Sequence, residues 1–70
     1  MFTYTITAYN KYGRPMAVET QVTDHWQATE LCCDMSMTYA YAEVINDNFQ
    51  THEGDYGDRP EALGDRVYTF

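Results

Sequence analysis

The chain has 70 residues, and its 11 acidic residues against 4 Lys and Arg give a formal net charge of −7 at pH 7. This length fits a single domain, residues 1–70, near the lower size limit for folding without disulfides or metals. The acidity argues against direct nucleic-acid binding and favours a protein partner with a basic surface. An apolar content of 44 % with seven tyrosines excludes a disordered acidic tail.

Cysteine use indicates a reducing compartment. Cys32 and Cys33 are adjacent in a predicted helix, where their side chains diverge by about 100° and are poorly placed to form a disulfide. The sequence also shows no signal segment and no apolar run of about 18 residues. These features predict a cytoplasmic protein, bacterial or acting in a host cell's cytosol, with no membrane contact.

The first third of the chain is predicted to form a β-hairpin. Residues 2–9 alternate between two faces and are rich in Thr, Tyr and Ile, which is typical of a half-buried strand. Residues 10–15 supply turn chemistry, with Gly13 free to adopt a positive φ. Alternation resumes over residues 16–22. The inner side of this second strand is expected to carry Met16, Val18, Thr20 and Val22.

Residues 24–49 are predicted to form one long helix, capped by Thr23 or Asp24. One apolar stripe at three-and-four spacing, expected to form the core, comprises Ala28, Leu31, Cys32, Met35, Tyr39, Ala42, Ile45 and Phe49. A second stripe, about 180° around the helix, comprises Trp26, Cys33, Met37, Ala40, Tyr41 and Val44. Because a single sheet covers only one helix face, the second stripe is expected to stay uncovered.

The rest of the chain is predicted to be an acidic loop and a short strand. Residues 51–65 are rich in glycine and acids, with one helical turn expected at residues 60–63. Residues 66–70 have strand propensity and can pair with the hairpin. The fold expected is α+β in the order β-β-α-β, with a three-stranded, mainly antiparallel sheet packed on one long helix.

The second helix stripe is the main candidate for a binding surface. Trp, Tyr and Met are enriched at interface hot spots, and large exposed apolar patches are uncommon on monomers. The residues predicted to contact a partner are Trp26, Cys33, Met37, Tyr41 and Val44. The partner is either a second copy, in a symmetric homodimer, or a foreign protein. Alternatively, loop 51–65 covers the stripe, or the helix breaks near residues 34–36 and re-aims it.

Carboxylates in the C-terminal half form a second candidate surface. Those predicted to contact the partner are Asp47, Glu53, Asp55, Asp58 and Glu61. Such a surface can imitate the phosphates of a nucleic acid and occupy a basic groove. The alternative is an ordinary solvated loop that keeps a small protein soluble.

The sequence offers no catalytic, metal or cofactor motif. An EF-hand loop starting at Asp47 fails because Phe49 and Thr51 replace its oxygen ligands and His52 replaces its glycine. The two cysteines point apart, so they do not form a zinc cluster with His25 and His52. We therefore expect a protein that is not an enzyme and has no cofactor. A weak cation-binding module is the least favoured alternative.

In size, acidity and β-β-α-β outline, the whole chain resembles the small accessory proteins of bacteriophages and plasmids. Examples are anti-CRISPR and anti-restriction proteins and inhibitors of DNA-repair glycosylases. The resemblance includes no shared motif, so it assigns no functional residue. It implies a non-enzymatic inhibitor that binds a host nucleic-acid-binding protein or complex. The alternative is a structural or regulatory homodimer, antitoxin-like or an assembly subunit, with no foreign target.

Overall fold

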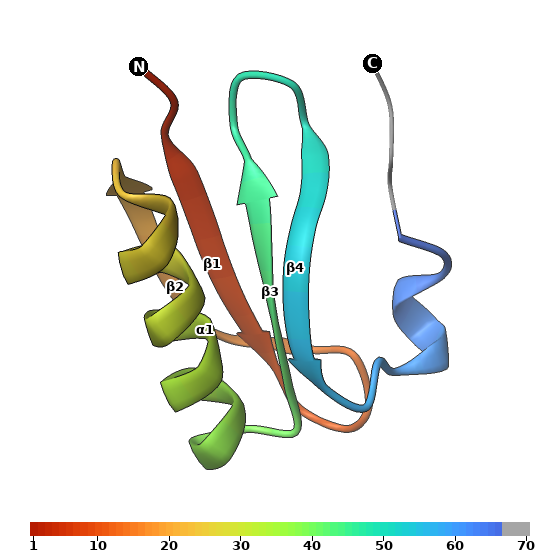
Figure 1. The fold of residues 1–70 in the computed structure, drawn as a ribbon. Coiled ribbons are helices and arrows are strands. Elements are labelled where there is room, and N and C mark those ends of the chain that lie inside the picture. The colour runs from red at the N-terminus through yellow and green to blue at the C-terminus, as the bar shows by residue number, and fades with distance from the viewer. Residues whose placement is uncertain (67–70) are drawn as a thin grey trace.

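One α-helix lies across one face of a four-stranded antiparallel sheet in the computed structural model, which describes residues 1–66 (Figure 1). The strands follow the order β2-β1-β3-β4 across the sheet. The elements in chain order are β1 (Tyr4–Tyr9), β2 (Pro15–Val22), α1 (His25–Thr38), β3 (Tyr41–Asn46), β4 (Thr51–Gly57) and the 3₁₀ helix η1 (Glu61–Leu63).

The predicted helix over residues 24–49 is wrong beyond Thr38, and the sheet has four strands rather than three. The helix ends because Tyr39 takes an extended conformation, while its N–H still donates to the carbonyl of Met35 at 2.9 Å. The next residues form β3, which pairs with β1 on one side and with β4 on the other. Backbone hydrogen bonds to two neighbours therefore hold this segment as a strand.

Two further predictions concern the C-terminal third. The predicted loop over residues 51–65 is wrong in its first half, which forms β4, whereas the helical turn expected at residues 60–63 is confirmed by η1. The predicted strand over residues 66–70 falls mostly outside the described residues, and Arg66, which is described, belongs to no strand.

The predicted hairpin is confirmed, with β1 and β2 joined by a tight turn. The side-chain oxygen of Asn10 accepts hydrogen bonds from the N–H groups of Tyr12 at 2.9 Å and Arg14 at 3.0 Å. Gly13 has a φ of +84°, and a Cβ there would lie 2.9 Å from the Cβ of Ala62 in η1. The turn therefore reaches across to the C-terminal segment, where glycine allows the close approach.

The predicted inner side of β2 is wrong for Met16, Val18 and Thr20, which are all exposed. Ala17 lies opposite Ala8 on the helix side of the sheet, and Val18 lies opposite Thr7 on the other side. Register shifts near both ends of β2 change which residues point inward. Such bulges insert an extra residue, so a strict alternation read from the sequence loses its phase.

The core lies between α1 and the sheet. The helix begins where the Asp24 side chain accepts from the N–H of Trp26 at 3.0 Å, as its predicted capping role requires. Burial, together with the negative charge of Asp55, raises the pKa of the Cys32 thiol to about 12, so this thiol stays protonated. The buried apolar cluster comprises Tyr4, Ile6, Ala8, Ala28, Cys32, Ala42 and Val44. Among the described residues, no helix is long and apolar enough to cross a membrane.

Among the glycines, Gly57 at the end of β4 lies closest to another backbone segment, and it gives a direct test of this fold. Its φ is +93°, and an added Cβ would fall on the carbonyl oxygen of Ala40, just before β3. We expect Gly57→Ala to lower the free energy of unfolding by about 2 kcal/mol or more. Gly54→Ala in the same strand, where a Cβ would meet nothing within 4 Å, is the control and should change it by less than about 1 kcal/mol. Urea denaturation measures both, and equal effects would contradict the packing of β4 against residue 40.

Candidate functional site

The solvent-facing side of α1 carries two exposed apolar side chains. Trp26 is 75 % exposed and Met37 is 78 % exposed, and they lie eleven residues, or about three helical turns, apart. Glu30 and the half-buried Cys33 lie between them at helical spacing, and Asp34 lies beside them. We call these five residues the α1 outer face.

The α1 outer face is shorter than the surface predicted from the sequence. Tyr41 and Val44 were predicted to be exposed there, but both belong to β3 and are buried. Val44 packs in the core against the inner side of α1, and Tyr41 lies on the opposite side of the sheet. Of the predicted helix surface, Trp26 and Met37 remain available to a partner, with Cys33 half-buried between them.

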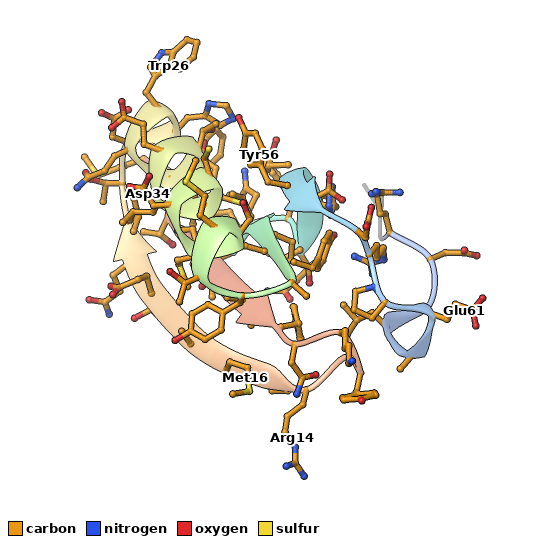
Figure 2. The ribbon with its side chains drawn as sticks, turned by 90° about the horizontal axis from the view of Figure 1, so that it is seen from below. Arg14, Met16, Trp26, Asp34, Tyr56 and Glu61 are labelled. Carbon is orange, nitrogen blue, oxygen red and sulfur yellow. The ribbon has the colours of Figure 1, made fainter. Side chains whose placement is uncertain are left out.

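The charge of this surface is negative throughout. Residues 24–38 include the acids Asp24, Glu30 and Asp34 and no Lys or Arg. Figure 2 shows Trp26 projecting away from the body of the molecule, with Asp34 further along the same helix. An apolar anchor surrounded by carboxylates suits a partner surface that is both basic and grooved.

Three of the five carboxylates predicted to contact a partner are bonded inside the chain. Asp47 accepts hydrogen bonds from the hydroxyls of Thr3 at 3.1 Å and Thr5 at 2.7 Å. Glu53 accepts from the side-chain amide of Asn46 at 3.1 Å. Asp55 accepts from Tyr41 and Arg66, both at 2.7 Å.

The remaining two predicted carboxylates, Asp58 and Glu61, are exposed. Glu61 lies in η1, away from Trp26 and at another end of the molecule (Figure 2). The structure therefore does not join the two predicted surfaces into one. It brings Glu30 and Asp34 to the apolar anchors instead, and neither is among the residues predicted to contact a partner.

A cluster of buried and half-buried polar side chains lies on the sheet face opposite α1. Glu43 is at its centre: its Oε2 accepts from Nη1 of Arg59 at 2.8 Å, and its Oε1 accepts from the hydroxyl of Tyr9 at 3.2 Å. Arg59 comes from the segment after β4, and it also donates to the hydroxyl of Tyr41 at 2.7 Å and to the carbonyl of Gly64 at 2.8 Å. This set, the Glu43 cluster, comprises Tyr9, Tyr41, Glu43, His52, Asp55 and Arg59.

A bulge in β4 helps to assemble the Glu43 cluster. Val44 pairs with Gly54 and Ile45 pairs with His52, so Glu53 is the extra residue. His52 and Asp55 therefore face the same side of the sheet although they are three residues apart. Nε2 of His52 lies 3.4 Å from Oδ2 of Asp55.

The cluster holds two carboxylates directly opposite each other, since Glu43 pairs with Asp55 across β3 and β4. Like charges at such a position repel unless cations compensate them. Arg59 bonds one carboxylate and Arg66 the other, at 2.8 Å and 2.7 Å. The two arginines therefore tie the C-terminal segment to the sheet, which gives the cluster a structural task.

The pKa shifts in the cluster follow from burial and from these bonds. Burial raises the pKa of the Tyr41 hydroxyl, and its hydrogen bond to Asp55 raises it further. Burial also raises the pKa of Tyr9, and the charge of Glu43 adds to the effect. Burial alone would raise the pKa of Asp55, but the bonds from Tyr41 and Arg66 outweigh it and lower that pKa. Both tyrosines therefore stay protonated and Asp55 stays ionised at neutral pH.

The Glu43 cluster shows no arrangement for binding a metal. Within residues 1–66, no group of three or more His, Cys, Asp or Glu side chains is placed to hold a metal ion.

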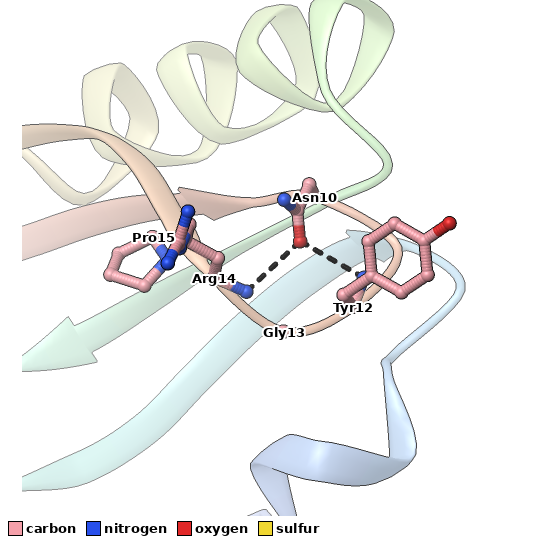
Figure 3. A pocket seen from close by; sticks show the side chains of 5 residues that line it. All are labelled: Asn10, Tyr12, Gly13, Arg14 and Pro15. Atoms are coloured by element: carbon pink, nitrogen blue, oxygen red, sulfur yellow. Dashed lines mark hydrogen bonds between the residues drawn. The ribbon is translucent and has the colours of Figure 1, made fainter.

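An open hollow of about 390 Å³ lies elsewhere, at the β1–β2 turn (Figure 3). There the Asn10 side chain is already bonded to the backbone N–H groups of Tyr12 and Arg14.

The Glu43 cluster was not predicted from the sequence, because residue 43 falls within the long helix predicted over residues 24–49. One feature of the sequence does indicate a strand at this position. Residues 41–46 alternate between Tyr41, Glu43 and Ile45 on one side and Ala42, Val44 and Asn46 on the other, and include two adjacent β-branched residues.

Comparisons with protein-family models, with curated proteins and with solved structures gave no match.

Arg59 tests the Glu43 cluster. Its side chain is 13 % exposed and that of Glu43 is 10 % exposed, so Arg59→Met leaves a buried carboxylate without its cation. We expect the free energy of unfolding in urea to fall by about 3 kcal/mol. Arg66→Met is the control: the Arg66 side chain is 41 % exposed, and the loss should be about 1 kcal/mol or less. Equal losses in the two variants would contradict a central role for Arg59.

Asp55 makes stability depend on pH in the acidic range. Its pKa is lower in the folded chain than its ordinary value of 3.8. The stability it contributes is therefore complete above that value and is lost as the pH falls through the lowered pKa. Thermal denaturation from pH 5 downward should show a shallower loss for Asp55→Asn than for the wild type. Asp58→Asn, which removes an exposed carboxylate, should keep the wild-type slope, and a shallower slope in that variant too would contradict the assignment.

Proposed function

We propose that this protein is a non-enzymatic, acidic protein-binding inhibitor, whose partner is a nucleic-acid-binding protein or complex. The α1 outer face docks in a basic groove of that partner. The observation that carries the proposal is the exposure of Trp26 and Met37 on a helix whose charged side chains are all acidic.

The two apolar side chains act as anchors. Trp is the residue type most enriched at interface hot spots, and Met adapts its shape to irregular pockets. Their separation, about three helical turns, matches the mode in which one helix face lies in a groove of the partner. Both side chains are exposed to water in the monomer, and docking would bury them against the partner.

The charges select the partner. Glu30 and Asp34 flank the anchors and would meet Lys or Arg side chains of the kind that bind phosphates. A partner surface covered in this way would no longer bind nucleic acid, so binding would inhibit it. Asp58 and Glu61, although remote from Trp26, add to the negative potential that speeds encounter with a basic surface.

The place of action we propose is the cytoplasm. Both thiols are free, and the Cys32 thiol is buried. Free cysteines are typical of proteins in a reducing compartment.

The anchors can be tested with a control of matched exposure. The tagged chain is used to capture proteins from a bacterial lysate at low and high salt, and affinity for the purified captured protein is then measured by calorimetry. We expect the double variant Trp26→Ala, Met37→Ala to weaken binding by at least about 30-fold, the size of one hot spot. Tyr12→Ala removes an aromatic side chain that is 73 % exposed in the hairpin turn, and it should bind as the wild type does.

The salt series and a nucleic-acid competition complete this test. Glu30→Lys with Asp34→Lys should slow association, and the wild-type affinity should fall as salt rises. The captured protein should lose nucleic-acid binding when the wild-type chain is added. The proposal would be overturned if capture changed neither with salt nor with the α1 substitutions. It would also be overturned if the complex still bound nucleic acid.

A further inference from the structure

The outer edge of β2 is one of the two edges of the sheet, with that of β4, where the described residues place no neighbouring strand. Such an edge presents unpaired N–H and C=O groups and readily accepts another strand. Two apolar side chains of β2 are also exposed, Met16 at 50 % and Val18 at 52 %. This edge is separate from the α1 outer face, so it concerns a different contact from the proposed function.

The middle of β2 is regular enough to pair. Ala17, Val18 and Glu19 lie in unbroken register with β1, and the register shifts fall on either side of them. Pro15, which lacks an N–H donor, lies at the first position of the strand. The strand has one charged side chain, Glu19, and no lysine of the kind that protects many edge strands.

The charge distribution indicates what can approach this edge. Residues 1–23 carry Lys11 and Arg14 against Glu19, a formal charge of +2 − 1 = +1. Residues 24–70 carry two Arg against the other ten acids, which gives +2 − 10 = −8. Two copies of the chain would therefore repel each other over most of their surfaces and least at the hairpin.

The charges along the edge also complement themselves. Arg14 immediately precedes β2 and projects outward in Figure 2, whereas Asp24 follows the strand at its other end. In an antiparallel pair centred on Val18, Arg14 of one copy lies opposite Val22 of the other, two residues from its Asp24. The basic end of β2 in each copy then lies near the acidic end of β2 in the other copy. The contact is therefore self-complementary, as a twofold contact requires.

We infer that β2 is a self-association edge, at which a second copy of this chain pairs antiparallel with β2. The two sheets join into one continuous eight-stranded sheet, with both α1 helices on the same side, because the twofold axis is perpendicular to the sheet. Val18 meets its own counterpart at that axis. The α1 outer face remains open to a partner in this dimer.

Sedimentation equilibrium of the purified chain tests the inference. The wild type should form a dimer, and Val18→Lys should raise the dissociation constant at least about tenfold, because two lysines would face each other at the axis. Met37→Lys, the matched change on the α1 outer face, should leave the dimer intact. Circular dichroism checks that both variants fold.

Hydrogen exchange on the wild type gives a second readout that needs no variant. Amide exchange in residues 15–22 should slow as the protein concentration rises, while exchange in α1 stays unchanged. A wild type that remains monomeric up to about 500 µM would overturn the inference, as would a dimer that survives Val18→Lys and dissociates with Met37→Lys. A monomer would leave the capture experiment on Trp26 unaffected, so the two proposals fail separately.

Discussion

Six consecutive residue pairs join β1 to β3 at the centre of the sheet, from Tyr4 opposite Asn46 to Tyr9 opposite Tyr41. This pairing sorts the residues of both strands onto two faces. Ile6 and Val44 meet on the side that α1 covers, and they form the apolar core. The other face receives polar side chains, which then need partners of their own. Both the core and the Glu43 cluster therefore follow from one backbone register.

The polar sheet face opposite α1 depends on the segment that follows β4. A carboxylate buried beside a second carboxylate is costly unless a cation reaches it. Arg59 supplies that cation to Glu43 from outside the sheet, and its bond to the carbonyl of Gly64 fixes the shape of the segment that carries it. Two of the four cationic side chains of this acidic protein, Arg59 and Arg66, are thus used internally. Because each is paired with a carboxylate, Lys11 and Arg14 are left against nine acids, and the charge outside these two pairs is +2 − 9 = −7.

The sequence was sufficient for the parts of the fold that local signals determine. The alternation of residues 2–9 predicted β1, the turn residues around Gly13 predicted the hairpin, and Asp24 was correctly expected among the candidate caps. The end of α1 was missed, although Val44 and Ile45 favour a strand, because Tyr39, Tyr41 and Val44 fit the spacing of a helix as well as that of a strand. Pairing with β1, which is a tertiary effect, decides between the two.

The candidate site was predictable to a similar extent. Trp26 and Met37 were placed correctly on an exposed helix face, since both lie before the point where the helix ends. Tyr41 and Val44 were placed on that face incorrectly, because the predicted helix extended too far along the chain. The meeting of His52 with Asp55 could not be foreseen, because it depends on a bulge at Glu53 that shifts the phase of β4.

The strand order also has a consequence for how the chain folds. The hairpin of β1 with β2 and the hairpin of β3 with β4 each join neighbours in sequence, and both can form early. The seam between the hairpins joins residues that are 32 to 42 positions apart. Closing that seam costs chain entropy before α1 can pack on a completed sheet. Docking of the two hairpins is therefore the step expected to set the folding rate of this small protein.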